Sequence, residues 1–205
     1  MAEAFYNATE GSGKKFHAWD RVIGANTVLA EFVLMGEYPL PTYTVHAAGV
    51  SCATVNDHIL QIMAGASLVV RVRRILIFQA GLAGAVNTGA FQLVRLTTAG
   101  TGGTAVTPGR VDNSDAAAGC TAMTLPTVKG TESTIIRQGR IGVYAAQPSN
   151  PNAKPLEMWQ ENLSGRAKPF LIAAGTANGV AVKSMAAVAG LTVDVFAEVV
   201  ETSYV

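Results

Sequence analysis

From about residue 58 onward, the chain is a series of short apolar runs rich in β-branched residues, separated by clusters of Gly, Asn, Pro and Ser. This pattern is typical of a sandwich or barrel of β-strands. Because nine such runs suffice for two packed sheets, we predict an all-β fold, an antiparallel β-sandwich. The predicted strands are His58–Met63, Leu68–Gln79, Ala90–Thr98, Cys120–Leu125, Ser133–Tyr144, Leu156–Leu163, Phe170–Ala174, Val180–Met185 and Leu191–Glu201.

The last predicted strand has the clearest alternation of apolar and polar positions. The apolar face, which we assign to the core, carries Leu191, Val193, Val195, Ala197 and Val199. The opposite face carries Asp194 and Glu198, but it also carries Phe196 and Val200. Because exposed apolar area needs a cover, we expect a second element or another subunit to lie against Phe196 and Val200.

The run Leu68–Gln79 begins with the same alternation and then loses it. Up to Arg73 the apolar residues share one face, whereas from Ile75 to Phe78 both faces are apolar. This change of phase predicts a β-bulge, or a strand end that is covered on both sides.

Two connections have their own patterns. Phe170–Met185 contains the segment Gly175–Gly179, and its composition predicts a β-hairpin in which glycines supply positive φ. Residues 97–119 are rich in Gly, Thr, Ala and Asn, and connections of this length are usually functional or flexible. Residues 147–155 are polar and proline-rich, as expected of a stiff crossover.

The N-terminal region differs from the rest, so we divide the chain into an arm with the first strands at residues 1–50 and a β-sandwich domain at residues 51–205. The arm has two prolines near residue 40, a flexible segment at Glu10–Lys15 and one strong apolar run, Val28–Met35. Chain ends are loose unless something holds them, so we expect the extended arm to bind a neighbouring subunit or surface.

The composition then narrows the class of protein. Charged residues make up 14% of the 205 residues, well below the roughly 25% of a typical soluble domain. The net charge of +1 suggests no nucleic-acid footprint, and no stretch is long and apolar enough to span a bilayer. Cys52 and Cys120 lack ligand-like spacing and are expected to be buried thiols. With no secretory signal pattern, we expect synthesis and assembly in a cytoplasm.

A search for catalytic patterns finds none, so we predict no enzymatic activity, catalytic residue, metal, cofactor or small-molecule substrate. His17, His46 and His58 lack the spacing of a metal site. Asp194 and Glu198 share a strand face, but four extended residues separate them by roughly 13 Å. That exceeds the roughly 5–9.5 Å of paired glycosidase carboxylates.

One basic concentration remains, and it consists of Arg71, Arg73, Arg74 and Arg95. These arginines would be adjacent if the two strands that carry them paired. We expect a solvated face or intersubunit salt bridges there rather than nucleic-acid binding.

The arrangement resembles the small capsid decoration (cement) proteins of tailed bacteriophages. The resemblance rests on the strands Leu68–Gln79 and Ala90–Thr98, the loop around Gly102–Pro108, and the region from Pro169 to Glu201. It implies a jelly-roll-like sandwich that forms homotrimers on the outer surface of a capsid and stabilises it. Its partners would be its own copies and the major capsid protein, and its location would be the virion.

Within this hypothesis no catalytic group is needed, because repeated interfaces of about 1,600 Å² can stabilise a shell. The residues we expect at interfaces with the capsid or other subunits are Phe5, Tyr6, Phe16 and Trp19 of the arm, with Phe196 and Val200 of the last strand.

Three other functions stay open. A jelly-roll major capsid protein would assemble the shell alone, and a receptor-binding head or tail fibre component would hold host glycans with its loops. A cupin-like enzyme shares the sandwich fold, but the three separated histidines argue against it.

Overall fold

The computed structural model describes residues 3–7, 15–23, 26–31, 40–81, 87–143, 154–161 and 168–202. The chain divides into two compact units, residues 1–39 and residues 40–205. All the elements in the described residues are β-strands. The prediction of an all-β sandwich is therefore confirmed.

The first unit contains a three-stranded antiparallel sheet in which β2 is the central strand. Its strands are β1 (Glu3–Asn7), β2 (Lys15–Ile23) and β3 (Asn26–Glu31). The boundary to the second unit lies near residue 39 rather than near residue 50, because the next strand, β4, pairs along most of its length with the last strand of the chain.

The second unit holds the remaining strands in two six-stranded sheets. They are β4 (Thr42–Ser51), β5 (His58–Met63), β6 (Val69–Gln79), β7 (Asn87–Leu96), β8 (Thr104–Val106), β9 (Gly109–Arg110), β10 (Thr121–Thr124), β11 (Glu132–Val143), β12 (Leu156–Gln160), β13 (Phe170–Ile172), β14 (Gly179–Ser184) and β15 (Thr192–Thr202). Every strand predicted from the sequence is present, and β4, β8 and β9 are additional.

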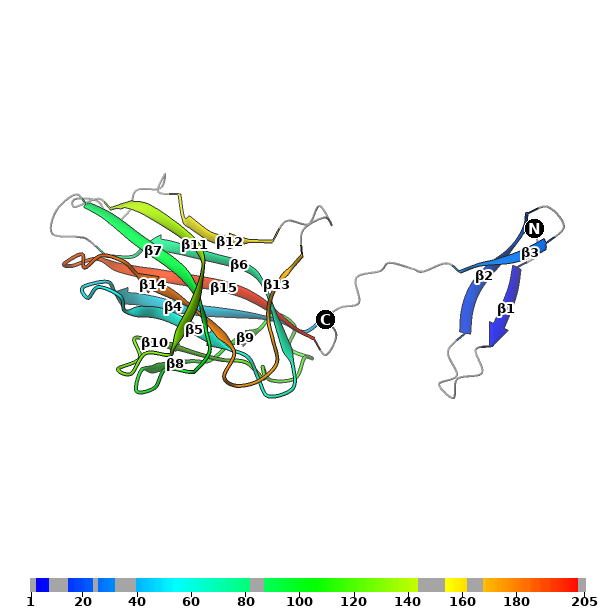
Figure 1. Ribbon diagram of the computed structural model, residues 1–205, viewed down its shortest axis with the longest axis horizontal. Helices are drawn as coiled ribbons and strands as arrows, with labels where there is room; N and C mark the ends of the chain where they lie inside the picture. Colours follow the sequence, from blue (N-terminus) through cyan, green and yellow to red (C-terminus); the bar gives the residue numbers. More distant parts are fainter. Residues whose placement is uncertain are drawn as a thin grey trace. The chain divides into compact units, whose positions relative to one another are not determined.

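The order of the long strands defines a jelly roll. One sheet runs β12-β6-β15-β4 and ends with β9, and the other runs β11-β7-β14-β5 and continues with β10 and β8 (Figure 1). Counted along the chain, the eight long strands lie in the orders first-eighth-third-sixth and second-seventh-fourth-fifth. Chain connections therefore pass repeatedly from one sheet to the other, as in a double Greek key.

This topology corrects one prediction and answers one open question. Phe170–Met185 is not a hairpin, because β13 pairs with β6 in one sheet while β14 pairs with β5 and β7 in the other. The strands Leu68–Gln79 and Ala90–Thr98 do not pair either, because β6 and β7 also belong to different sheets. Gly175 does have a positive φ of 116°, but the turn that it makes carries the chain between sheets.

The core lies between the facing sides of the two sheets. The inward-facing row of β15, which consists of Val193, Val195, Ala197 and Val199, is fully buried. It belongs to one cluster with residues of the opposite sheet such as Phe91 and Leu93. The assignment of this face of β15 to the core is confirmed.

The predicted irregularity in Leu68–Gln79 is a bulge in β6. Glu198 of β15 pairs with Arg74, and the next residue, Val199, pairs with Val72. Arg73 is therefore the extra residue, and the bulge reverses the phase of the strand. Val72 before the bulge and Ile75 after it both face the core.

The connection at residues 97–119 is built into the sheets. It contributes β8 and β9, and the backbone of Gly100 forms two hydrogen bonds with the buried side chain of Gln61. Further along, a Cβ added to Gly130 would lie 3.3 Å from Leu96. The segments around Gly100 and Gly130 thus lie close to Gln61 and Leu96, and Leu96 belongs to a second small core with Met63, Val94 and Ala181.

Glu201 joins the end of β15 to the start of β10. Its side chain is buried, with 3% of the residue exposed. One carboxylate oxygen accepts the N–H of Gly119 at 2.9 Å, and the other accepts the N–H of Cys120 at 2.5 Å. A carboxylate is well suited to this position because both of its oxygens act as acceptors.

We expect the substitution Glu201→Gln to lower the free energy of unfolding by about 2 kcal/mol, because the amide NH2 would face a backbone N–H and leave a buried donor without an acceptor. Urea unfolding followed by circular dichroism measures this difference. The exposed Glu157, replaced by Gln, is the matched control and should change the free energy by less than about 0.5 kcal/mol. Equal effects of the two substitutions would contradict this role for Glu201.

Candidate functional site

The outer face of the β12-β6-β15-β4 sheet carries exposed apolar side chains. Phe196 on β15 pairs with Leu76 on β6 and with His46 on β4, so these positions form one row across the sheet. Leu76 and Phe196 are partly exposed, and Phe78, two positions along β6, is 38% exposed. We call Leu76, Phe78 and Phe196 the outer-face patch.

Sequence analysis identified Phe196 and missed the other two residues of the patch. The signal was present in the loss of alternation after Arg74. Once the bulge at Arg73 resets the phase, Ile75 and Ile77 face inward while Leu76 and Phe78 face outward.

Val200 was expected at an interface with another protein, but the structure buries it within its own chain. It is only 4% exposed, so its apolar area is already covered within the chain. Val200 therefore offers almost no surface to a partner.

The four aromatic residues expected at an interface through the arm lie on β1 and β2. The backbone register pairs Tyr6 with Phe16, and Phe5 and Trp19 pair with His17 and Glu3. The two strands thus bring all four aromatics into one small sheet. Their side chains lie outside the described part of the structure.

Next to the outer-face patch, β6 and its neighbours carry charged pairs. Arg71 Nε donates to Glu161 Oε1 at 2.7 Å, and Arg73 Nε lies 3.5 Å from Glu198 Oε1. Both ion pairs lie within one chain, whereas sequence analysis expected a solvated face or salt bridges between subunits.

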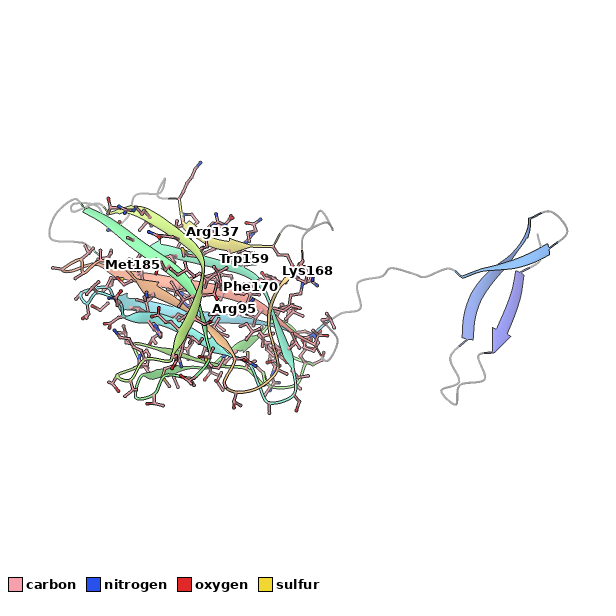
Figure 2. All side chains as sticks on the ribbon, in the orientation of Figure 1. Arg95, Arg137, Trp159, Lys168, Phe170 and Met185 are labelled. Carbon is pink, nitrogen blue, oxygen red and sulfur yellow. The ribbon has the colours of Figure 1, made fainter. Side chains whose placement is uncertain are left out.

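Arg95, the fourth residue of the basic group, lies on β7 in the other sheet. Its guanidinium group lies 4.8 Å from the ring centre of Phe170 and donates to the carbonyl of Leu171 at 2.9 Å. Trp159 packs edge-on against Phe170, and its indole N–H donates to the carbonyl of Val72. Figure 2 labels Arg95, Trp159 and Phe170 on the sandwich. Because β6 and β7 are in different sheets, the arginines do not form the single basic patch that pairing of these strands would have produced.

A second ionic cluster surrounds His58, which is fully buried. Its Nε2 lies 3.0 Å from Glu132 Oε1, and Lys183 Nζ donates to Glu132 Oε2 at 2.6 Å. Partial burial raises the pKa of Glu132, but the hydrogen bonds from Lys183 and His58 outweigh it and hold the pKa below its usual value of 4.5. The cluster joins β5, β11 and β14 through side-chain hydrogen bonds, and we assign it a structural role.

The two cysteines are free and buried, as predicted. Burial raises the pKa of Cys52 to about 12, with the nearby charge of Asp57 as a smaller cause. Burial likewise raises the pKa of Cys120 to about 12, assisted by the charge of Glu201. Both thiols are therefore protonated near neutral pH.

Within the described residues, no group of three or more His, Cys, Asp or Glu side chains is placed to hold a metal ion. That same part of the chain contains no helix with the length and apolarity to cross a membrane.

The fold and the outer face define the class: a jelly-roll β-sandwich protein with a small separate N-terminal sheet and a partly apolar sheet surface. Comparisons with protein-family models, curated proteins and solved structures found no match.

The lowered pKa of Glu132 gives a pH-dependent prediction. A carboxyl group whose pKa is lower in the folded state contributes its full stability above its usual pKa and loses it as the pH falls through the folded value. We expect Glu132→Gln to lower the free energy of unfolding by about 1 kcal/mol at pH 7. The difference from wild type should shrink below pH 4.5. Urea unfolding across this pH range measures it, with Glu157→Gln as control, and a difference that grows on acidification would refute the assignment.

Proposed function

We propose that this protein is a structural component of a phage virion, which binds the outer surface of the capsid and stabilises it as a decoration protein. The observation that carries the proposal is the separate N-terminal unit of 39 residues. Units below about 40 residues usually need a disulfide, a metal or a partner to be stable, and residues 1–39 contain no cysteine. Burial against a neighbouring protein would supply the missing area, and on a virion that protein is the major capsid protein.

Two further features support the proposal. The jelly roll is a recurrent architecture of viral capsid proteins, although lectins and cupins share it. The low content of charged residues leaves much of the surface uncharged and suited to association. Fold alone does not specify function, so the proposal depends on the N-terminal unit and the exposed sheet face.

The outer-face patch supports self-association as the second part of the proposal. Aromatic side chains are enriched in protein interfaces, and a partly apolar centre with charged pairs beside it matches the usual interface anatomy. We assign this face to contacts between copies of the chain, in a homotrimer. The protein in this role has no substrate or cofactor, and it acts on the capsid surface after assembly in the host cytoplasm.

Removal of residues 1–39 should abolish attachment to capsids while leaving the jelly roll folded, because the second unit has its own core. Cosedimentation with capsids purified without this protein measures attachment. A full-length variant with Phe5, Tyr6, Phe16 and Trp19 all replaced by Ser should show the same loss. Undiminished attachment of both variants would refute the role of the N-terminal unit, and unaided assembly of the wild-type chain into closed shells would instead identify a major capsid protein.

The substitution Phe196→Asp should disrupt the homo-oligomer, because a carboxylate at the centre of an apolar contact loses its hydration. Light scattering coupled to size-exclusion chromatography measures the mass of the species in solution. Val128, which is 63% exposed and lies outside the outer-face patch, provides the matched control Val128→Asp. An unchanged oligomeric mass for Phe196→Asp would remove the outer face from the interface.

A further inference from the structure

The backbone pairing of the N-terminal sheet assigns each of its positions to one of two faces. β2 lies between β1 and β3 (Figure 1), and residues paired across neighbouring strands share a face. The apolar positions of one face, which we call the mixed face, are Phe5, Trp19, Ile23, Val28 and Ala30. Those of the opposite face, which we call the acidic face, are Ala4, Tyr6, Phe16, Ala18, Val22 and Leu29.

Neither face has the composition of a solvated sheet surface. An antiparallel sheet with one face in water alternates apolar and polar positions, so that its outer face is polar. Here each face has two aromatic positions, and Trp19 of the mixed face is the central one of three paired residues, between Glu3 and Ala30. The sheet therefore needs a cover on both sides, and the capsid surface proposed above supplies only one.

The charges of the two faces differ. The mixed face carries both signs, with Lys15, Arg21 and Glu3, whereas the charged positions of the acidic face are Asp20 and Glu31. Because Glu31 pairs with the residue two positions before Asp20, the two acidic positions are diagonal neighbours. Two acidic faces placed against each other would bring four carboxylates together, and like charges across an interface oppose association.

The mixed face, in contrast, is complementary to itself. In a two-fold contact between identical surfaces, each pair of contacting residues occurs twice. Glu3 of each copy can therefore meet a cation of the other copy, so the charges of the two faces attract. Aromatic residues and arginine are also the types enriched at the centres of protein interfaces, and this face has Trp19 and Arg21.

We propose that the mixed face binds the mixed face of a second copy, so that two N-terminal sheets stack as a small two-layer β-sandwich. The acidic face is then left for the capsid, and this part of the arrangement rests on the function proposed above. Since the second units associate through the outer-face patch, contacts between N-terminal sheets join one homotrimer to the next.

Cross-linking of introduced cysteines tests this contact in the full chain. Ala30 on the mixed face and Ala18 on the acidic face provide the matched substitutions Ala30→Cys and Ala18→Cys. The native cysteines are buried, so the wild-type chain is the background control. With a bismaleimide that spans the roughly 10 Å between stacked sheets, we expect Ala30→Cys to give covalent dimers on a denaturing gel. Ala18→Cys and the wild-type chain should stay monomeric on the same gel.

A change of charge tests why the mixed face is chosen. Replacing Lys15 and Arg21 by Glu in the Ala30→Cys chain leaves only carboxylates among the charges of this face, so the covalent dimers should be lost. The same change of charge at Arg137 and Arg140, which are exposed on β11, is the matched control and should leave the dimers in place. Circular dichroism verifies that the variants are folded.

Three results would overturn the proposal. They are equal cross-linking of Ala30→Cys and Ala18→Cys, cross-linking only when these two variants are mixed, and no cross-linking of Ala30→Cys either in solution or on capsids. Covalent dimers that survive the replacement of Lys15 and Arg21 would also overturn it. The dimers should persist when Phe196→Asp is added, because the contact does not use the outer-face patch.

Attachment to capsids is measured separately by cosedimentation, so the two proposals fail in different ways. Covalent dimers of Ala30→Cys without attachment would support the contact between copies and contradict the capsid-binding role. Attachment without covalent dimers would contradict the contact between copies and leave the capsid-binding role in place.

Discussion

The structure depends above all on the burial of the inward-facing row of β15. This strand is hydrogen-bonded on one side to β4 and on the other to β6, so it occupies the middle of its sheet. Its four small aliphatic side chains are fully buried against the opposite sheet. Because the side-chain period of a strand is two, fixing this row inward also fixes Phe196 and Glu198 on the outside.

The two sheets differ in how far the apolar side chains on their outer faces are buried. On the β11-β7-β14-β5 sheet, the segments around Gly100 and Gly130 lie close to Gln61 and Leu96, and Leu96 is buried with Met63 and their neighbours. On the other sheet, the described residues leave Phe78 and its neighbours partly exposed. The described residues thus bury apolar side chains on one of these outer faces and leave apolar side chains of the other partly exposed.

Much of the fold could be predicted from the sequence, because a strand with one buried face shows a local alternation of apolar and polar residues. The strands and even the bulge near Arg73 were visible in this way. The strand partners were not, since a hairpin at Phe170–Met185 is locally reasonable and only the global topology sends β13 and β14 into different sheets.

The site was less accessible to sequence analysis. Contacts such as Arg71 with Glu161 join residues 90 positions apart, and no local pattern links them. The role of Glu201 could not be predicted for the same reason. Its partners, the N–H groups of Gly119 and Cys120, lie at the end of a connection whose composition suggested a loop. Val200 shares the alternation of Phe196, and only the packed structure reveals that one is covered and the other open.

The junction between the two units has a mechanical consequence. Thr42, the first residue of β4, is paired with Val200, and the carbonyl of the adjacent Pro41 accepts the N–H of Glu201. A pull along the axis of β4 would load the hydrogen bonds of the β4–β15 ladder together, in shear, rather than breaking them one after another. A tether anchored through residue 39 would therefore transmit tension into the central strand of the sheet, which is the part of the sandwich best able to resist it.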